Sequence, residues 1–115
     1  MLNLRHCHFF AVCDGHGHNG QEVSGLLKHR LPFQIEKHLK DGLSKQSMQK
    51  YPESAVITEN LTKAFAESNN EVYKMVSDVR FSGSTCTSII TYGRKVYCAN
   101  VGDSRSILIR AAPNA

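Results

Sequence analysis

Residues 8–17, His-Phe-Phe-Ala-Val-Cys-Asp-Gly-His-Gly, decide how this chain folds. The apolar run 8–13 predicts a short strand, and Asp14-Gly15 ends it, because this dipeptide favours a turn. The glycine-rich turn continues to Gly20 and leads into a segment with helical periodicity. The sequence therefore predicts a strand, a tight turn and a helix in succession.

Apolar residues at helical spacing predict helices in the middle of the chain. Pro32 is expected to break or kink the first of them, since proline lacks the amide proton of a helical hydrogen bond. Gly42 is expected to stop the second piece. The expected helices cover residues 21–31, 33–40 and 53–79, the last with Leu61, Ala64, Phe65, Val72 and Val76 as its buried stripe, and a polar loop covers residues 42–52.

The last third of the chain is rich in small and β-branched residues, which strands prefer. The expected strands are residues 82–92, 95–101 and 106–110, with a hairpin turn at Gly93-Arg94 and a break at residues 102–105. One strand, then helices, then a meander of strands predicts a single domain of the α+β class rather than a regular β-α alternation.

The composition is that of an ordinary globular protein, with 41% hydrophobic and 21% charged residues and a net charge of +4. The basic residues are scattered, so we expect a solvated surface and no nucleic-acid partner. No apolar run approaches the length of a membrane span and residues 1–20 lack a signal-peptide pattern, so we expect no membrane contact. Cys7, Cys13, Cys86 and Cys98 form no Cys-x-x-Cys pair, which predicts reduced thiols in a cytoplasmic or nuclear protein.

Residues 15–20, Gly-His-Gly-His-Asn-Gly, also match the Gly-x-Gly-x-x-Gly fingerprint of dinucleotide-binding proteins. Asp14 would face the pyrophosphate with like charge, and no second strand is expected before residue 82, so we disfavour this interpretation. Zinc is another alternative, because histidines and cysteines surround the turn. Their spacing matches no closed structural zinc site.

The turn offers the oxygen atoms that hard divalent cations prefer. A carboxylate at Asp14 and the carbonyl of Gly15 can point the same way after a buried strand. His16 beside them can donate a proton near neutral pH. On the turn alone, an ordinary Asp-Gly turn with a surface histidine is an equally weighted alternative.

Three segments, taken in order, resemble the type-2C class of metal-dependent protein serine/threonine phosphatases. They are the apolar strand that runs into Asp14-Gly15-His16-Gly17, then Ser82-Gly83-Ser84-Thr85, then Asn100-Val101-Gly102-Asp103-Ser104-Arg105. Residues 18–32 resemble the plant and protist branch of that class. The resemblance implies that residues 1–115 are an N-terminal portion of the catalytic domain. The fold expected is a partial four-layer sandwich of antiparallel β-sheets flanked by helices, incomplete at both ends.

The resemblance implies hydrolysis of phosphoserine and phosphothreonine in protein substrates by a water activated by two Mg²⁺ or Mn²⁺ ions. It makes Asp14 the bridging metal ligand, Gly15 a ligand through its carbonyl, and His16 the acid that protonates the leaving oxygen. Asp103 matches a ligand of a third, weaker metal site. A turn-stabilising aspartate, hydrogen-bonded to Arg105 or a backbone amide, is its open alternative. Ser84 and Thr85 are expected to pack and hydrogen-bond rather than act as nucleophiles.

The chain also departs from the family pattern. The family's phosphate-gripping arginine and an acidic ligand lie well upstream of the turn, and Arg5 is too close to be that arginine. Two further aspartate ligands of the family have no counterpart after residue 112. We therefore expect the chain alone to be nearly inactive and to self-associate through open sheet edges. The alternative is a non-catalytic truncated homologue that acts as a binding or regulatory fragment, or an incomplete gene model.

Overall fold

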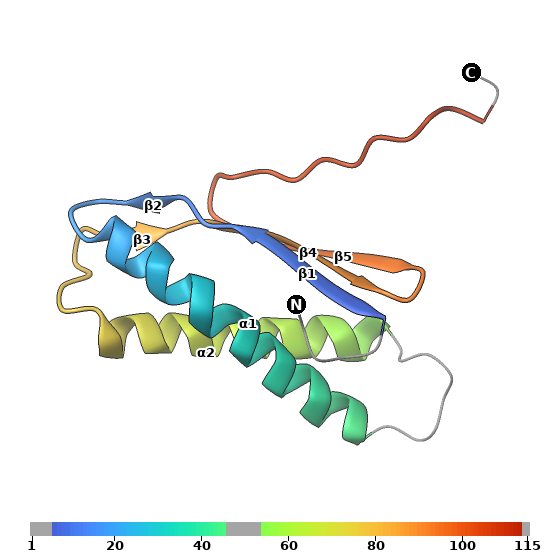
Figure 1. Ribbon diagram of the computed structural model, residues 1–115, viewed down its shortest axis with the longest axis horizontal. Helices are drawn as coiled ribbons and strands as arrows, with labels where there is room; N and C mark the ends of the chain where they lie inside the picture. Colours follow the sequence, from blue (N-terminus) through green and yellow to red (C-terminus); the bar gives the residue numbers. More distant parts are fainter. Residues whose placement is uncertain (1–5, 46–53, 114–115) are drawn as a thin grey trace.

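Two long helices cover one face of a three-stranded antiparallel sheet in the computed structural model, which describes residues 6–45 and 54–113 (Figure 1). The larger sheet contains β1 (Cys7–Val12), β4 (Cys86–Tyr92) and β5 (Lys95–Val101), the smaller pair contains β2 (Gly15–His16) and β3 (Gly83–Ser84), and the helices are α1 (Gly20–Ser44) and α2 (Ser54–Met75). This arrangement confirms the α+β class and supplies one helix layer and one sheet layer of the expected sandwich. Neither helix in these described ranges is long and apolar enough to cross a membrane.

The sheet places the N-terminal strand beside a strand from the last third of the chain. β4 lies in the centre, with β1 and β5 antiparallel on its two sides. The predicted hairpin at Gly93-Arg94 is confirmed, because Tyr92 pairs with Lys95 and Gly93 has a φ of +60°. A positive φ at this position suits glycine, which has no Cβ to clash with the backbone.

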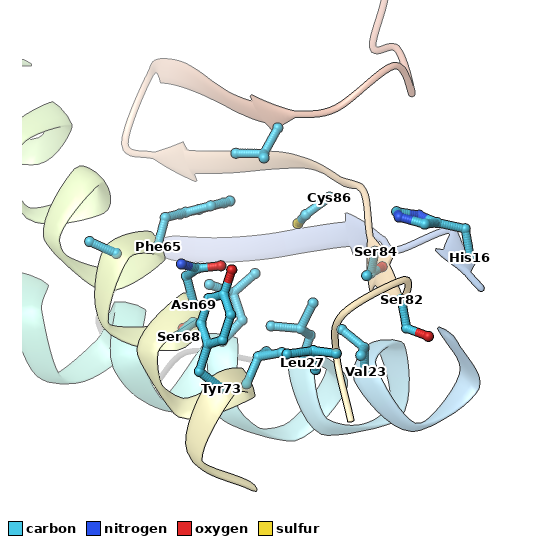
Figure 2. Close-up of a pocket in the computed structure, with 16 residues that line it drawn as sticks. His16, Val23, Leu27, Phe65, Ser68, Asn69, Tyr73, Ser82, Ser84 and Cys86 are labelled. Atoms are coloured by element: carbon cyan, nitrogen blue, oxygen red, sulfur yellow. The ribbon is translucent and has the colours of Figure 1, made fainter. Parts of the chain in front are cut away.

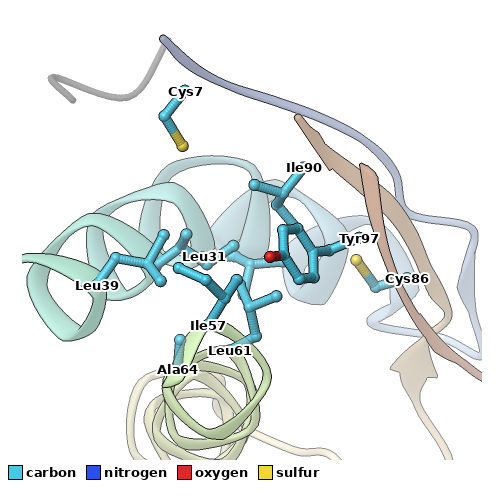
Figure 3. Close-up of a cluster of buried hydrophobic side chains, with 10 residues drawn as sticks. Cys7, Leu31, Leu39, Ile57, Leu61, Ala64, Cys86, Ile90 and Tyr97 are labelled. Carbon is cyan, nitrogen blue, oxygen red and sulfur yellow. The ribbon is translucent and has the colours of Figure 1, made fainter. Parts of the chain in front are cut away.

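Side chains alternate between the two faces of the sheet. The inner face of the three strands packs against the helices, and the main core lies between these layers (Figure 3). Its buried members are Cys7, Leu31, Ile35, Leu39, Ile57, Leu61, Ala64, Cys86, Ile90 and Tyr97. The outer face is open, and Phe10, Val12 and Val96 on it are each more than 60% exposed.

The helices differ from expectation where tertiary packing overrides local signals. The predicted division into two helices at Pro32 and the predicted stop at Gly42 are wrong, because α1 runs without interruption from Gly20 to Ser44. Leu31 and Ile35, on either side of the proline, are both buried in the core, and their burial offsets the hydrogen bond that proline cannot donate. The predicted stripe of the next helix is confirmed at Leu61, Ala64 and Val72, although α2 ends at Met75 rather than near residue 79.

The predicted strand at residues 106–110 is also wrong. The chain leaves β5 after Val101 and continues as a segment that pairs with no described strand (Figure 1). Ile107, Leu108 and Ile109 on this segment are highly exposed. A β-branched sequence needs a neighbouring strand to form a ladder, and no strand lies opposite this segment among the residues described. Residues 46–52 of the predicted loop, and Arg5, lie outside the described residues.

Candidate active site

The turn after β1 presents the carboxylate of Asp14 to solvent while fixing its backbone. The Asp14 amide donates a hydrogen bond of 3.1 Å to Oγ1 of Thr85, and the Thr85 amide donates one of 3.0 Å to the Asp14 carbonyl. Asp14 is exposed, and none of the hydrogen bonds or ion pairs of the described residues uses its carboxylate. An unpaired carboxylate on a fixed backbone is suited to bind a cation.

Two glycines allow this turn to pack against its neighbours. Gly17 has a φ of +81°, and a Cβ atom there would lie 2.0 Å from the carbonyl oxygen of Phe81. A Cβ atom on Gly15 would lie 2.3 Å from the carbonyl oxygen of Gly20. The amide of Asn19 then donates a hydrogen bond of 2.9 Å to Ser82 Oγ, so the turn is joined to the segment that precedes β3. Any side chain at either glycine would displace the turn.

His16 lies in β2, opposite Gly83 of β3. Its imidazole rests against that glycine, since a Cβ atom on Gly83 would lie only 3.0 Å from His16 Nε2. The ring is exposed, and it lines the rim of a cavity of about 450 Å³ together with Ser82 and Ser84 (Figure 2). The imidazole can therefore exchange a proton with a molecule that approaches the turn from solvent.

Thr85 joins the third predicted segment to the other two. Its Oγ1 lies 2.7 Å from Ser104 Oγ, and Gly102, with a φ of +96°, approaches its side chain so closely that a Cβ would lie 2.8 Å from Thr85 Cγ2. Asp103 lies between Gly102 and Ser104 in the sequence and is exposed. The alternative of a turn-stabilising aspartate finds no support, because no hydrogen bond of the described residues involves Asp103. Asn100 instead donates one to the Gly102 carbonyl.

The structure brings together all four predicted site residues in one region, yet they do not complete a metal site. Carboxylate and carbonyl oxygens from Asp14 and Gly15 are suitable for Mg²⁺ or Mn²⁺. Within residues 6–45 and 54–113, no group of three or more His, Cys, Asp or Glu side chains could hold a metal ion. Asp14 and Gly15 thus supply donor types that suit a hard cation, but the described residues do not complete a site around it.

A pair of thiols lies behind the turn. Interaction with the Cys86 thiol lowers the pKa of Cys13 to about 7, against the opposing effect of burial. The same interaction, together with burial, raises the pKa of Cys86. Both cysteines are free, and Cys13 is the residue that immediately precedes Asp14.

The joining role of Thr85 is the part of the site that the sequence did not reveal. A hydrogen-bonding role for Thr85 was expected and is confirmed, but its two partners were not. Asp14 and Thr85 are 71 residues apart, and only the register of β1 on β4 brings them together. The available signal was a threonine placed directly before a strand, which is too common a pattern to identify such a contact.

Comparisons with known proteins agree with the three segments. A family model described as Protein phosphatase 2C matches residues 3–115. Probable protein phosphatase 2C 35 from Arabidopsis thaliana is 36% identical over 101 residues, which are 88% of this chain and 26% of that protein. Probable protein phosphatase 2C 72 from the same plant is 37% identical over 97 residues, 84% of this chain and 29% of that protein.

A mammalian relative extends the similarity beyond plants. Protein phosphatase 1L from Bos taurus is 29% identical over 118 aligned positions, which cover 100% of this chain and 31% of that protein. The chain thus spans about a quarter to a third of the length of these relatives. Because the family model covers nearly the whole chain and the three predicted segments meet in the structure, the chain belongs to the protein phosphatase 2C family.

Proposed function

We propose that this chain supplies part of the active site of an enzyme that hydrolyses phosphoserine and phosphothreonine in proteins. The observation that carries the proposal is the meeting of three separate segments at Thr85, which fixes the backbone of Asp14 two residues before His16 and leaves its carboxylate unpaired among the described residues. Metal-assisted phosphoester hydrolysis uses carboxylates that bind the cations and a proton donor for the leaving oxygen, and Asp14 and His16 have the chemistry for these two roles. Membership of the family supports this assignment.

Asp14 and Gly15 would hold Mg²⁺ or Mn²⁺ through their carboxylate and carbonyl oxygens. Two such ions, when bound, lower the pKa of a water molecule and offset the charge of the phosphate. Asp103 would contribute to a third, weaker site, from its exposed position between Gly102 and Ser104. His16 would hold a proton on its exposed imidazole and give it to the serine or threonine oxygen as that group leaves.

Phosphorylated proteins are the proposed substrates, and the cytoplasm or nucleus is the proposed location. Self-association is proposed for the chain on its own. The outer edge of β5 pairs with no strand of the described residues, and the outer face carries exposed Phe10, Val12 and Val96. Open ladder edges and apolar sheet faces favour pairing with another copy.

A chimera tests the proposed function directly. The matching segment of Probable protein phosphatase 2C 72 is replaced by this chain, so that the relative supplies the rest of its own length. We expect Mn²⁺-dependent release of phosphate from a phosphothreonine peptide, with the unmodified relative as the reference. A well-folded chimera that releases no phosphate while the unmodified relative does would contradict the proposal.

The second candidate function is that of a non-catalytic binding or regulatory fragment. Measurements on the isolated chain, compared with those on the chimera, distinguish it from the enzyme. Since no cluster of three metal-binding side chains lies within the described residues, we expect weak or no Mn²⁺ binding by calorimetry and negligible peptide hydrolysis by the isolated chain. An inactive isolated chain together with an active chimera supports the enzyme. Inactivity of both, with the chimera folded, supports the non-catalytic fragment.

A further inference from the structure

Cys13 and Cys86 lie directly opposite each other on neighbouring strands. The last ladder pair of β1 and β4 is Val12 with Thr87, and the Thr85 amide bonds to the Asp14 carbonyl just beyond it. The two cysteines occupy the position between these contacts. Cys13 packs against the core cluster that contains Cys86, so both side chains lie on the helix-covered face of the sheet.

The ladder position of the two cysteines is compatible with a disulfide. Hydrogen-bonded and non-hydrogen-bonded pairs alternate along an antiparallel ladder. Because Asp14 and Thr85 share backbone hydrogen bonding, the preceding Cys13–Cys86 pair is of the non-hydrogen-bonded kind, whose Cα atoms are typically about 4.5 Å apart. Disulfides form between Cα atoms about 4.4–6.8 Å apart, so little backbone movement is needed.

Two cavities border the pair, one beside each cysteine. Cys13 is half-buried and lines a cavity of about 550 Å³ beside α1, while Cys86 lines the cavity of about 450 Å³ that His16 borders (Figure 2). A small uncharged oxidant such as hydrogen peroxide fits in either space. The remaining two cysteines lie elsewhere. Cys7 is buried at the far end of β1 opposite Tyr92, and Cys98 points from the outer face of the sheet, where it pairs with Ile89.

We propose that Cys13 and Cys86 form a redox-modification site that peroxide converts to a disulfide. In the first step the Cys13 sulfur bonds to one peroxide oxygen, the O–O bond breaks, and a sulfenic acid and water result. In the second step the Cys86 sulfur bonds to the Cys13 sulfur, and the S–O bond breaks. Hydroxide leaves and takes the Cys86 proton as water. Two thiols lose two electrons in total, and one peroxide becomes two waters.

The bond would join β1 to β4 at the residue before Asp14. It would hold the turn of the candidate active site covalently against the strand that contains Thr85. In the proposed cytoplasmic or nuclear location such a bond is transient, since cellular thiols reduce it again. The fraction of chains with a disulfide next to Asp14 would therefore rise and fall with the peroxide level.

The full chain treated with a small excess of peroxide tests the site without any phosphatase assay. We expect the number of free thiols to fall from the four in the sequence to two, with a mass decrease of about 2 Da for the two hydrogens lost. Peptide mapping without reduction should recover Cys13 linked to Cys86, and dithiothreitol should restore the original mass. Cys13→Ser and Cys86→Ser should each lose the bond, whereas the matched control Cys98→Ser should keep it.

A second measurement guards against variants that fail to fold. The wild-type chain is oxidised in parallel in guanidinium chloride, where the pairing should spread over Cys7 and Cys98 as well. A native map equal to the denatured one would overturn the proposal. So would a sulfinic acid on Cys13 with Cys86 still reduced, or peroxide that modifies Cys98 alone.

Discussion

The side chain of Thr85 holds the backbone of Asp14 from 71 residues away, through a hydrogen bond of 3.1 Å from the Asp14 amide to Thr85 Oγ1. The same oxygen lies 2.7 Å from Ser104 Oγ. One buried hydroxyl therefore positions the turn that carries the candidate metal ligand and the segment that carries Asp103.

Thr85→Val should destabilise the fold by about 1–3 kcal/mol, because it leaves the Asp14 amide without its acceptor while keeping the shape of the side chain. The measurement is the free energy of unfolding in urea. Thr62→Val, on the exposed side of α2, is the matched control and should change the stability by less than about 0.5 kcal/mol. Equal effects of the two substitutions would show that the Thr85 contact is not important.

Asp14→Asn should abolish Mn²⁺-dependent peptide hydrolysis by the chimera, because it removes the negative charge that holds the cations. Since the carboxylate has no protein partner within the described residues, the stability of the chain should change little. Asp41→Asn, at an exposed position on α1, is the control for a general charge effect. Retained hydrolysis in Asp14→Asn would remove Asp14 from the proposed ligands.

His16→Gln should slow the chimera more on a phosphothreonine peptide than on p-nitrophenyl phosphate. An alkoxide leaving group needs a proton, whereas p-nitrophenolate leaves without one, so loss of the acid affects the peptide most. Turnover numbers for both substrates provide the comparison, and His29→Gln on the exposed side of α1 is the control. Equal losses on the two substrates would indicate a structural role for His16.

Gly83→Ala should reproduce part of this pattern without touching His16. The new methyl group would lie 3.0 Å from His16 Nε2, so the imidazole has to move away. We expect peptide turnover to fall several-fold and p-nitrophenyl phosphate turnover to fall less. Gly25→Ala, which meets no atom within 4 Å, should leave both rates unchanged. A Gly83→Ala chimera with wild-type rates on both substrates would show that the ring position is not critical.

Glu71→Gln should lower the stability near pH 7 and have no effect in strong acid. Hydrogen bonding to Arg30, assisted by Gln34, holds the pKa of Glu71 below its usual value of 4.5. A depressed pKa in the folded state stabilises the fold above pH 4.5, and this stabilisation is lost as the pH falls through the folded-state pKa. Unfolding at pH 7 should therefore show a difference of about 1–3 kcal/mol between variant and wild type, and this difference should shrink as the pH is lowered below 4.5.

The control for this ion pair is Glu59→Gln. Glu59 pairs with Lys63 on one helix, and both side chains are more than half exposed, so the change should stay below about 0.5 kcal/mol at either pH. An equal effect of the two substitutions would mean that the contact between α1 and α2 at Glu71 contributes no more than a surface pair.

The sequence predicted the elements whose signals are local. The predicted strand at residues 95–101 and its hairpin turn are confirmed. Both could be predicted because side-chain alternation and a glycine turn are signals carried by neighbouring residues. Pro32 was judged by its local effect alone, and the packing of Leu31 and Ile35 overrode it. The strand expected at residues 106–110 failed for the opposite reason, since its residues suit a ladder that has no partner among the described strands.

The candidate site shows the same contrast between features with a local sequence signal and features that depend on distant contacts. The residue types at Asp14, Gly15 and His16 indicated metal chemistry, but on the turn alone an ordinary Asp-Gly turn carried equal weight. Only the resemblance to a family favoured the metal site. The contacts of Thr85 could not be predicted, because they depend on the register between strands that are distant in sequence. The thiol pair was likewise hidden, since Cys13 and Cys86 show no motif until the ladder sets them opposite each other.

The pairing of β1 with β4 also determines the order in which this chain can fold as it leaves the ribosome. β1 cannot pair with β4 until both helices and residues 86–92 have been synthesised. Helices form from local contacts, whereas closing a long loop costs entropy before its contacts are made. The apolar segment Phe9-Phe10-Ala11-Val12 thus spends this interval on the nascent chain without its β4 partner, and a chaperone would have time to bind it. The aspartate at its end takes its final position only when β4 arrives, so the pairing of these two distant strands is also the step that fixes the Asp14 turn.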